Sequence, residues 1–407
     1  MRHRGERLLL RQAVILVGGL GTRLGSLTRD VPKPMLPVAG EPFLDILLRN
    51  IVRHGFEDII LLARHQAQNI RDHYASRRIG NASIRVLEET AKAGTGGALR
   101  EAASELDEVF LLSNGDSLFD FNYLALAQHF REKACTLALA LREVPDVSRY
   151  GQVGLDISGK VVSFAEKNRI SGGPGLINGG VYVVSRQILK DIGSGEISLE
   201  NDVIPPLIKR GHVYGKQFDG YFLDIGIPAS YARAQHELPA QMNRKVVFFD
   251  RDGTLNRDEG YTHKVEDLVW LPGSMEVIRR CNEAGRLVIV LTNQAGIAYG
   301  YYDIDQMHRF NRAMNDQLRE QGAHIDAFYF CPHHPNGAVA NLTRACSCRK
   351  PGTGLFEQAC GDWPIDLSDA VMIGDKPSDL AAAKEFGVRA LRTDGSDLEN
   401  IFENIEI

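Results

Sequence analysis

The sequence lacks the features that mark membrane proteins, nucleic-acid-binding proteins and disulfide-stabilised domains. No apolar run among its 407 residues approaches the ~18 residues needed to cross a membrane. The leucines at positions 8–10 form a run shorter than the ~7-residue core of a secretory signal, so we expect a cytoplasmic protein with no membrane partner. A net charge of −5 argues against a nucleic-acid partner, which usually requires a basic excess. Six cysteines are too few for a disulfide scaffold in a chain this long.

What is present is the pattern of a large globular protein. Hydrophobic residues make up 44% and charged residues 24%, and the length predicts two or three domains. Apolar runs typical of buried parallel strands alternate with helical patterns in two separate series. In the first series we expect strands at 13–17, 58–62 and 109–112 and a helix at 43–54. In the second we expect strands at 245–249, 287–291 and 370–373 and a helix at 274–284.

Strands alternating with helices predict the α/β class, with helices on both faces of parallel sheets. The stretch 238–244 separates the two series and is interpreted as a short linker. We therefore expect two domains, residues 1–240 and residues 241–407. No internal repeat of 20–50 residues is visible, which excludes a solenoid or a β-helix.

A glycine-rich segment follows the first predicted strand. Gly18, Gly19 and Gly21 precede Arg23, and Lys33 follows between two prolines. The spacing matches neither the dinucleotide-binding fingerprint nor the P-loop. Glycines at a strand end let backbone N–H groups approach phosphate oxygens, and an arginine adds a fixed positive fork. On these residues alone, a phosphate site and a tight turn with solvated charges both remain open.

Further motifs follow in order at 94–97, 114–116, 166–167, 178–180 and 223–228. Together with segments 17–24 and 32–38, they resemble the signature of sugar-1-phosphate nucleotidyltransferases over about residues 11–237. The resemblance implies a Rossmann-like domain with a mixed, mostly parallel sheet. It also implies an enzyme in which a sugar 1-phosphate attacks the α-phosphorus of a nucleoside triphosphate and pyrophosphate leaves.

The same resemblance assigns roles to individual residues. Asn168 and Ile227 depart from the family pattern at the sugar end, which leaves the sugar's identity in doubt. The implied groups are Gly18, Gly19, Gly21, Gly94 and Thr95 for the nucleotide, Arg23 and Lys33 for catalysis, Asp116 and Asp224 for Mg²⁺, and Glu166, Lys167, Asn178 and Gly180 for the sugar phosphate.

Glu89 is the residue that this resemblance places against the nucleobase. Uridylyl- and thymidylyltransferases typically carry glutamine there, which both donates and accepts hydrogen bonds, whereas a carboxylate only accepts. Guanine offers two adjacent donors that a carboxylate can take together, so Glu89 predicts GTP. Cytosine and adenine also offer an amino donor, and Glu88 and Glu89 could instead be exposed charges at a strand end.

The second series opens on a hydrophobic strand that ends in Asp250 and Asp252. Strand period two would place both carboxylates on the same side. Thr292 with Asn293, Arg349 with Lys350, and Asp375 with Asp379 follow at later positions, and this order resembles the haloacid dehalogenase (HAD) superfamily of phosphatases over about residues 245–400. The resemblance implies a doubly wound parallel sheet.

This second resemblance implies an aspartyl-phosphate mechanism. Asp250 would attack phosphorus, and Asp252 would protonate the leaving alkoxide and then deprotonate the hydrolytic water. Thr292 and Lys350 would hold the phosphoryl oxygens. Asp375, Asp250 and the backbone carbonyl of Asp252 would bind a second Mg²⁺, with Asp379 in support.

Three of the six cysteines cluster with a histidine. Cys331, His333, Cys346 and Cys348 form two ligand pairs, which suits tetrahedral zinc in a structural site. His334 competes with His333, and a disulfide is the alternative that a cytoplasmic location disfavours. The remaining cysteines, Cys135, Cys281 and Cys360, are expected to be ordinary buried thiols.

The zinc loop and the segment Gly260–Tyr261–x–His263 resemble D-glycero-D-manno-heptose 1,7-bisphosphate phosphatases, in which Arg349 would contact the distal phosphate and Asn293 would also bind the sugar phosphate. Histidinol-phosphate phosphatases share the zinc knuckle. Because a heptose-bisphosphate phosphatase would supply a heptose guanylyltransferase with its substrate, the fusion predicts a bifunctional enzyme. The alternatives are a mannose-1-phosphate guanylyltransferase joined to a histidinol-phosphate-type phosphatase, and a non-catalytic scaffold. The partners expected are small-molecule substrates, and homo-oligomerisation is left open.

Overall fold

The computed structural model describes residues 10–75, 77–165, 172–396 and 398–403. The chain divides into two compact units, Met1–Ala240 and Gln241–Ile407. Glu166, Lys167 and Asn168 lie outside the described residues. Within the described ranges, no helix is both long enough and apolar enough to cross a membrane.

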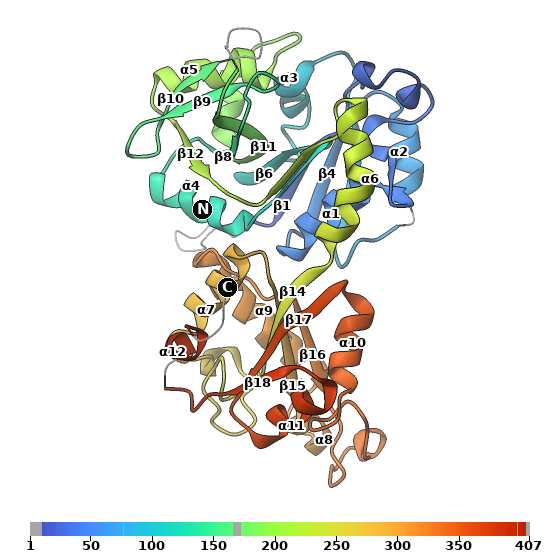
Figure 1. The fold of residues 1–407 in the computed structure, drawn as a ribbon, viewed down its shortest axis with the longest axis vertical. Helices are drawn as coiled ribbons and strands as arrows, with labels where there is room; N and C mark the ends of the chain where they lie inside the picture. The colour runs from blue at the N-terminus through green and yellow to red at the C-terminus, as the bar shows by residue number, and fades with distance from the viewer. Residues whose placement is uncertain (1–9, 76, 166–171, 397, 404–407) are drawn as a thin grey trace. The chain divides into compact units, whose positions relative to one another are not determined.

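The first unit is built on a mixed nine-stranded sheet (Figure 1). Strands β6, β1, β4 and β5 are parallel and adjacent, and the long strand β11 runs antiparallel to β6 and β8. The fold class predicted for this half is therefore confirmed. The strands are β1 (Gln12–Leu16), β2 (Pro37–Val38), β3 (Glu41–Pro42), β4 (Asp58–Ala63), β5 (Ser83–Glu88), β6 (Val109–Asn114), β7 (Ser117–Asp120), β8 (Leu137–Val144), β9 (Gln152–Leu155), β10 (Val161–Ala165), β11 (Gly175–Ser185), β12 (Val213–Gln217) and β13 (Tyr221–Asp224).

The central strands of this sheet consist of apolar residues that are almost wholly buried, as expected for parallel strands covered on both faces. Because β6 and β1 are parallel neighbours, the loops that follow them leave the same edge of the sheet. The α-helices are α1 (Phe43–Arg53), α2 (Ala67–Tyr74), α3 (Gly94–Glu101), α4 (Tyr123–Lys133), α5 (Ile204–Lys209) and α6 (Pro228–Met242), with 3-10 segments Thr22–Thr28, Lys33–Met35 and Arg186–Asp191 and a π-helix at Leu199–Val203.

The second unit is a five-stranded, fully parallel sheet in the order β16-β15-β14-β17-β18. Its strands are β14 (Arg244–Phe249), β15 (Leu287–Asn293), β16 (Ala327–Cys331), β17 (Ile365–Gly374) and β18 (Arg389–Arg392). Its α-helices are α7 (Ser274–Glu283), α8 (Ala295–Tyr299), α9 (Ile304–Glu320), α10 (Gly354–Asp362), α11 (Pro377–Phe386) and α12 (Leu398–Phe402), with 3-10 turns Val265–Asp267 and Ala340–Leu342.

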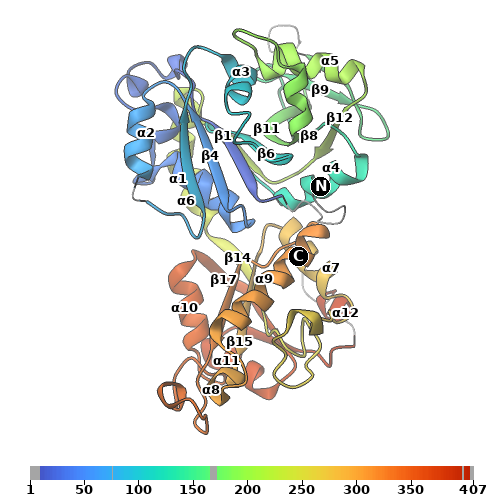
Figure 2. The same cartoon turned by 180° about the vertical axis from the view of Figure 1, so that it is seen from behind.

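Side-chain alternation along β14 explains why helices cover both faces of this sheet (Figures 1 and 2). Val247 and Phe249 pack with residues of α7, α9 and α12, whereas Val246 and Phe248 pack with residues of α10 and α11. From Val246 to Phe249 both faces of the strand are fully buried, so this part of it has no polar side. This arrangement is the doubly wound sheet predicted from the sequence.

The stretch 238–244, interpreted as a short linker, contains the boundary between the two units at Ala240 and Gln241, but most of it is helical. Helix α6 continues to Met242, and β14 begins at Arg244. Leu238 and Ala234 are completely buried, so the apolar side of the helix stabilises it past Pro239, which occupies an internal helical position.

Candidate active sites

The glycine-rich loop after β1 lines a cavity of about 450 Å³ in the first unit. A second cavity of about 430 Å³ shares Arg23, Asn114, Asp116 and Glu200 with the first, so the two are contiguous. The first is lined by the residues predicted to bind the nucleotide, Gly18, Gly19, Gly21, Glu89, Gly94 and Thr95, together with the predicted catalytic residues Arg23 and Lys33 and the predicted metal ligand Asp116. The second adds Asn178, Gly180 and Asp224, which were predicted for the sugar phosphate and the metal.

A lysine lies between the two predicted metal ligands at the junction of these cavities. The Nζ of Lys33 is 2.5 Å from Asp116 Oδ2 and 3.7 Å from Asp224 Oδ1. Asp224 reaches this position because β13 pairs with β7, which places Asp224 opposite Ser117, the residue after Asp116. Lys33 is almost fully buried, so it cannot turn away into solvent. Its ammonium therefore neutralises part of the negative charge of Asp116, which lines both cavities, and of Asp224, which lines the second.

Glu89 and its neighbour Glu88 differ in surroundings. Glu88 is exposed and its carboxylate binds Arg71 Nη2 at 2.8 Å. Glu89 is half-buried and lines the nucleotide cavity. Its carboxylate lies so close to the glycine loop that a Cβ at Gly18 would come within 2.5 Å of Glu89 Oε1. Burial raises the pKa of Glu89 and the nearby Glu101 adds to the rise, while Arg64 opposes it.

Thr95 makes a contact that the sequence did not predict. Its hydroxyl donates to Glu200 Oε2 at 3.0 Å and accepts from the Leu199 amide at 2.7 Å, which ties α3 to the π-helix Leu199–Val203. Glu200 borders both cavities and was missed. Its local sequence is that of an ordinary polar segment, so only the fold identifies it as a site residue.

Three carboxylates and a lysine gather at the carboxyl ends of the strands in the second unit. One oxygen from each of Asp250, Asp375 and Asp379 lies within 4.8 Å of the others. Lys350 Nζ lies 3.0 Å from Asp250 Oδ1 and 2.6 Å from Asp379 Oδ1. Burial raises the pKa of Asp250 to about 6, with Lys350 opposing the rise and Asp379 and Asp252 adding to it. One lysine does not neutralise this buried group of carboxylates.

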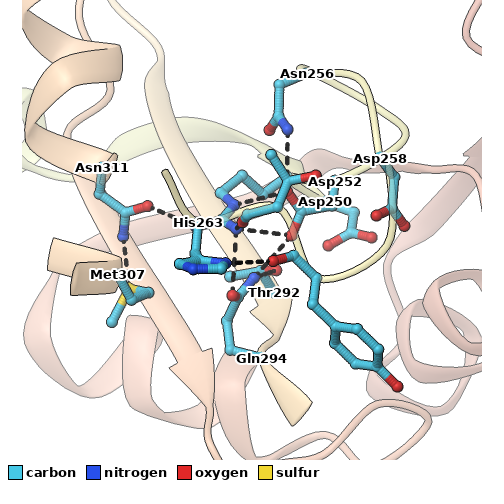
Figure 3. A network of polar contacts seen from close by, with 12 residues as sticks. Asp250, Asp252, Asn256, Asp258, His263, Thr292, Gln294, Met307 and Asn311 are labelled. Carbon is cyan, nitrogen blue, oxygen red and sulfur yellow. Dashed lines mark hydrogen bonds and ion pairs between the residues drawn. The ribbon is translucent and has the colours of Figure 1, made fainter. Parts of the chain in front are cut away.

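The carboxylate of Asp252 is outside this cluster. Strand β14 ends at Phe249, so the alternation that predicted a shared side for Asp250 and Asp252 does not govern the chain beyond it. Both residues are buried, but the Asp252 oxygens are held by Arg251, Asn256 and Gln294 (Figure 3). Arg251 and Gln294 were missed by sequence reasoning, although each adjoins a predicted site residue.

The residues predicted to bind the phosphoryl group and the substrate have different surroundings. Thr292 is buried at the end of β15, beside Gln294. The Asn293 amide accepts from the Lys350 amide at 3.0 Å and donates to its carbonyl at 3.0 Å, so it anchors that loop. Arg349 Nη1 donates to the carbonyl of His333 at 3.3 Å, which joins the segment of predicted zinc ligands to the loop that carries Lys350.

The four residues predicted to bind zinc converge on one point. Cys331, Cys346 and Cys348 have Sγ–Sγ distances of 3.2–3.4 Å, and His333 Nδ1 lies 3.4 Å from Cys348 Sγ. These separations are too long for a disulfide and suit ligands of a single ion. The His334 ring is not part of this cluster, and its Nδ1 lies 2.9 Å from the hydroxyl of Tyr299. Burial, with Arg344 adding to it, lowers the pKa of His333, which favours the neutral imidazole that a metal requires.

The class of protein follows from comparison with known families. The nucleotidyl transferase family model matches residues 12–241, more than half of the chain, and the chain belongs to that family. A second model, described as HAD-hydrolase-like, matches residues 347–395. The chain is therefore a bifunctional enzyme that joins a nucleotidyltransferase to a phosphatase.

Individual relatives match each half separately. The N-terminal part is 34% identical over 220 residues to D-glycero-alpha-D-manno-heptose 1-phosphate guanylyltransferase of Campylobacter jejuni, covering 54% of this chain and 96% of that protein. A further 164 residues are 39% identical to D-glycero-beta-D-manno-heptose-1,7-bisphosphate 7-phosphatase of Rhodopseudomonas palustris, covering 40% of this chain and 91% of that protein. The crystal structure of HddC from Yersinia pseudotuberculosis complexed with GMP-PN is similar with a TM-score of 0.51 and 33% identity, covering 56% of this chain and all of that one.

Proposed function

We propose that the chain catalyses two consecutive steps of sugar-nucleotide synthesis. The phosphatase unit removes the 7-phosphate of D-glycero-D-manno-heptose 1,7-bisphosphate, and the transferase unit joins GMP from GTP to the resulting heptose 1-phosphate. The observation that carries this proposal is the pair of relatives: one is named for removing the 7-phosphate of a heptose 1,7-bisphosphate, the other for using a heptose 1-phosphate, and both match a single chain.

The phosphatase residues suit an aspartyl-phosphate mechanism. Asp250 Oδ would attack phosphorus while Asp252 delivers a proton to the leaving oxygen, and Lys350 and Thr292 would hold the phosphoryl oxygens. Asp250 Oδ1 and Asp379 Oδ1 are buried oxygens without a hydrogen-bond partner, although both lie within ion-pair distance of Lys350. Such oxygens fit Mg²⁺, which Asp250, Asp375 and the Asp252 carbonyl would hold. The ion, when bound, would offset repulsion between carboxylate and phosphate.

The transferase residues suit an in-line attack on the α-phosphorus. The glycine loop, Arg23 and Lys33 would bind the triphosphate, while the second cavity would hold the heptose 1-phosphate through Asn178 and Gly180. Asp116 and Asp224 present hard oxygen ligands at the junction of the cavities, which fits Mg²⁺ there. The ion, when bound, would neutralise phosphate charge. The roles of Glu166 and Lys167 in gripping the sugar phosphate rest on the family resemblance.

Guanine is the base that the site favours. Glu89 is a half-buried acceptor within the nucleotide cavity, and a structure 33% identical to this chain is complexed with GMP-PN. A carboxylate can accept from N1–H and the 2-amino group of guanine together. We therefore assign GTP to the site.

The anomer of the bisphosphate follows from the chemistry of the two steps. Hydrolysis at C7 leaves C1 untouched, so the heptose 1-phosphate keeps the anomeric configuration of the bisphosphate. The guanylyltransferase relative is named for the alpha anomer, whereas the phosphatase relative is named for beta. Coupled turnover in one chain requires the alpha anomer, and we assign it to this enzyme.

The test is to offer each anomer of heptose 1,7-bisphosphate with a panel of nucleoside triphosphates and to identify products by mass spectrometry. GDP-heptose with release of phosphate and pyrophosphate is expected from the alpha anomer with GTP. Mannose 1-phosphate and histidinol phosphate are included as competing substrates. Faster turnover of those two would overturn the heptose assignment, and no pyrophosphate with any sugar 1-phosphate would indicate a scaffold.

A further inference from the structure

The carboxylate of Asp252 is surrounded by hydrogen-bond donors from three residues. Arg251 donates to Oδ1 from Nε at 3.0 Å and to Oδ2 from Nη2 at 2.9 Å. Asn256 Nδ2 donates to Oδ1 at 3.0 Å, and Gln294 Nε2 donates to Oδ2 at 2.8 Å (Figure 3). Each carboxylate oxygen thus accepts two hydrogen bonds, which fixes the orientation of the group. Of these three partners, Gln294 also contacts a residue predicted to bind the phosphoryl group.

The orientation of the Gln294 amide is determined by its neighbours. Its Oε1 accepts from Tyr302 Oη at 2.6 Å and from Arg251 Nη2 at 3.2 Å. A guanidinium can only donate, so the oxygen of the amide must face Arg251 and the NH₂ group must face the other way. Tyr302 is held in turn by the His263 ring, which stacks on it with centroids 4.4 Å apart.

The NH₂ group of Gln294 therefore serves two acceptors. One is Asp252 Oδ2, and the other is Thr292 Oγ1 at 2.9 Å. Because Thr292 Oγ1 accepts a hydrogen bond from Gln294, its own hydrogen remains available for another acceptor. In a phosphatase that acceptor is a phosphoryl oxygen, which carries negative charge and has no hydrogen of its own.

We propose that Gln294 is a positioning residue of the phosphatase, which directs the Thr292 hydroxyl hydrogen at the phosphoryl group and fixes Asp252 for proton transfer. The inference rests on the phosphatase function proposed above. Gln294 is 1% exposed and its four polar contacts are all internal, so its amide has no solvent-facing alternative.

The two proton transfers that Gln294 would support are opposite in direction. In the first, Asp250 Oδ bonds to phosphorus, the bond from phosphorus to the sugar oxygen breaks, and that oxygen takes a proton from Asp252. In the second, water bonds to phosphorus, gives its proton to Asp252, and the phosphorus bond to Asp250 breaks to release phosphate. Asp252 is protonated before the first step and again after the second, so one fixed position of its carboxyl group serves both proton transfers.

Substrates with different leaving groups separate a positioning role from a structural one. A sugar alkoxide needs a proton as it leaves, whereas p-nitrophenolate does not. In Gln294→Glu the ionised side chain only accepts, so the hydrogen of Thr292 turns to it and Asp252 gains a like charge beside it. We expect kcat/KM for the heptose bisphosphate to fall by about 100-fold or more, and for p-nitrophenyl phosphate by about tenfold, because general acid catalysis contributes roughly 10²–10⁴.

Tyr302→Phe is the second variant and keeps the ring stacked on His263. It removes one of the two donors that orient the Gln294 amide, so we expect a smaller loss with the same dependence on leaving group. Asn315→Ala is the matched control, since Asn315 lies in the same helix α9 and exchanges hydrogen bonds of 3.0 and 2.8 Å with the backbone of Ile325 rather than with the Arg251, Asp252 and Gln294 network. Any loss in Asn315→Ala should be equal for the two substrates.

Thermal unfolding of the phosphatase unit shows whether each variant is folded, and the transferase activity of the same sample measures the concentration of intact chain. If Gln294→Glu does not fold, Tyr302→Phe carries the test. Equal losses on both substrates in every folded variant, or no loss at all, would overturn the positioning role. Failure of the proposed phosphatase function is distinguishable, because the wild-type enzyme would then leave heptose bisphosphate intact while cleaving p-nitrophenyl phosphate.

Discussion

At the scale of single residues, we propose that the choice of nucleobase depends on Glu89. Its carboxylate lies in the nucleotide cavity against Gly18, where a larger residue than glycine would collide with it. Glu89→Gln replaces one acceptor oxygen with a donor group, which suits a pyrimidine imide better than guanine. We expect the ratio of kcat/KM for GTP to that for UTP to fall by about tenfold or more, since a bidentate contact is worth roughly 1–3 kcal/mol. Steady-state kinetics with both nucleotides measure this ratio.

Glu88→Gln is the control for that measurement. Glu88 precedes Glu89 directly but is exposed and pairs with Arg71. Its substitution should leave the GTP to UTP ratio unchanged. An unchanged ratio in Glu89→Gln would refute the assignment of the base.

The same residue predicts a pH dependence of GTP binding. Burial, with Glu101 adding to it, raises the pKa of Glu89, so the side chain takes up its proton at a higher pH than an ordinary glutamate. The protonated acid loses an acceptor for guanine, and GTP affinity should therefore fall as pH decreases through the raised pKa. Calorimetric titration at several pH values measures this loss. The phosphates of GTP titrate identically in Glu89→Gln, so a matching fall in that variant would contradict the prediction.

At the scale of elements, the loop between β16 and α10 is expected to depend on zinc. The predicted ligand Cys331 ends β16, and the loop carries the other three, His333, Cys346 and Cys348, before it leads directly into Lys350. Cys346→Ser should lower the zinc content and the phosphatase activity, because the loop that places Lys350 loses its anchor. A loss of even ~2 kcal/mol would lower the melting temperature of this unit by roughly 4–8 °C. Elemental analysis and thermal unfolding test both effects.

Cys360→Ser provides the comparison for the zinc loop. Cys360 is a half-buried thiol in α10 and lies outside the Cys/His cluster. Its substitution should keep the zinc and the activity of the wild type. Full zinc content in purified Cys346→Ser would show that the cluster does not bind zinc as assigned.

At the scale of the whole molecule, the two units carry separate sets of site residues. We expect Asp250→Asn to abolish phosphatase activity and to spare guanylyl transfer from GTP to added heptose 1-phosphate. Asp116→Ala should do the reverse. Phosphate and pyrophosphate release, assayed separately, measure each step. Loss of both activities in either folded variant would mean that the two sites are not independent.

The order of the strands and helices could be predicted from the sequence because each element is indicated by the apolar pattern of its own residues. The predicted strands and helices of both series occur within a few residues of the expected bounds, and the parallel core of each sheet follows from apolar runs without a polar face. The linker interpreted at 238–244 contains the boundary between the two units, but helix α6 continues through it to Met242 with Leu238 fully buried. The burial of Leu238 is a tertiary property that the composition of the segment does not reveal.

The sequence by itself determined the class of chemistry: two phosphate sites, a cysteine cluster and the arrangement of two enzymes on one chain. These depend on residue types at short spacings, which the chain order preserves. Only the tertiary structure decided that Lys33 lies between Asp116 and Asp224, that Glu200 borders both cavities and that Gln294 connects Asp252 to Thr292. Apart from the contact of Gln294 with Thr292, these contacts join side chains that are far apart in the chain and that only folding brings together. Their hydrogen-bond directions and charge balance therefore cannot be read from the local sequence.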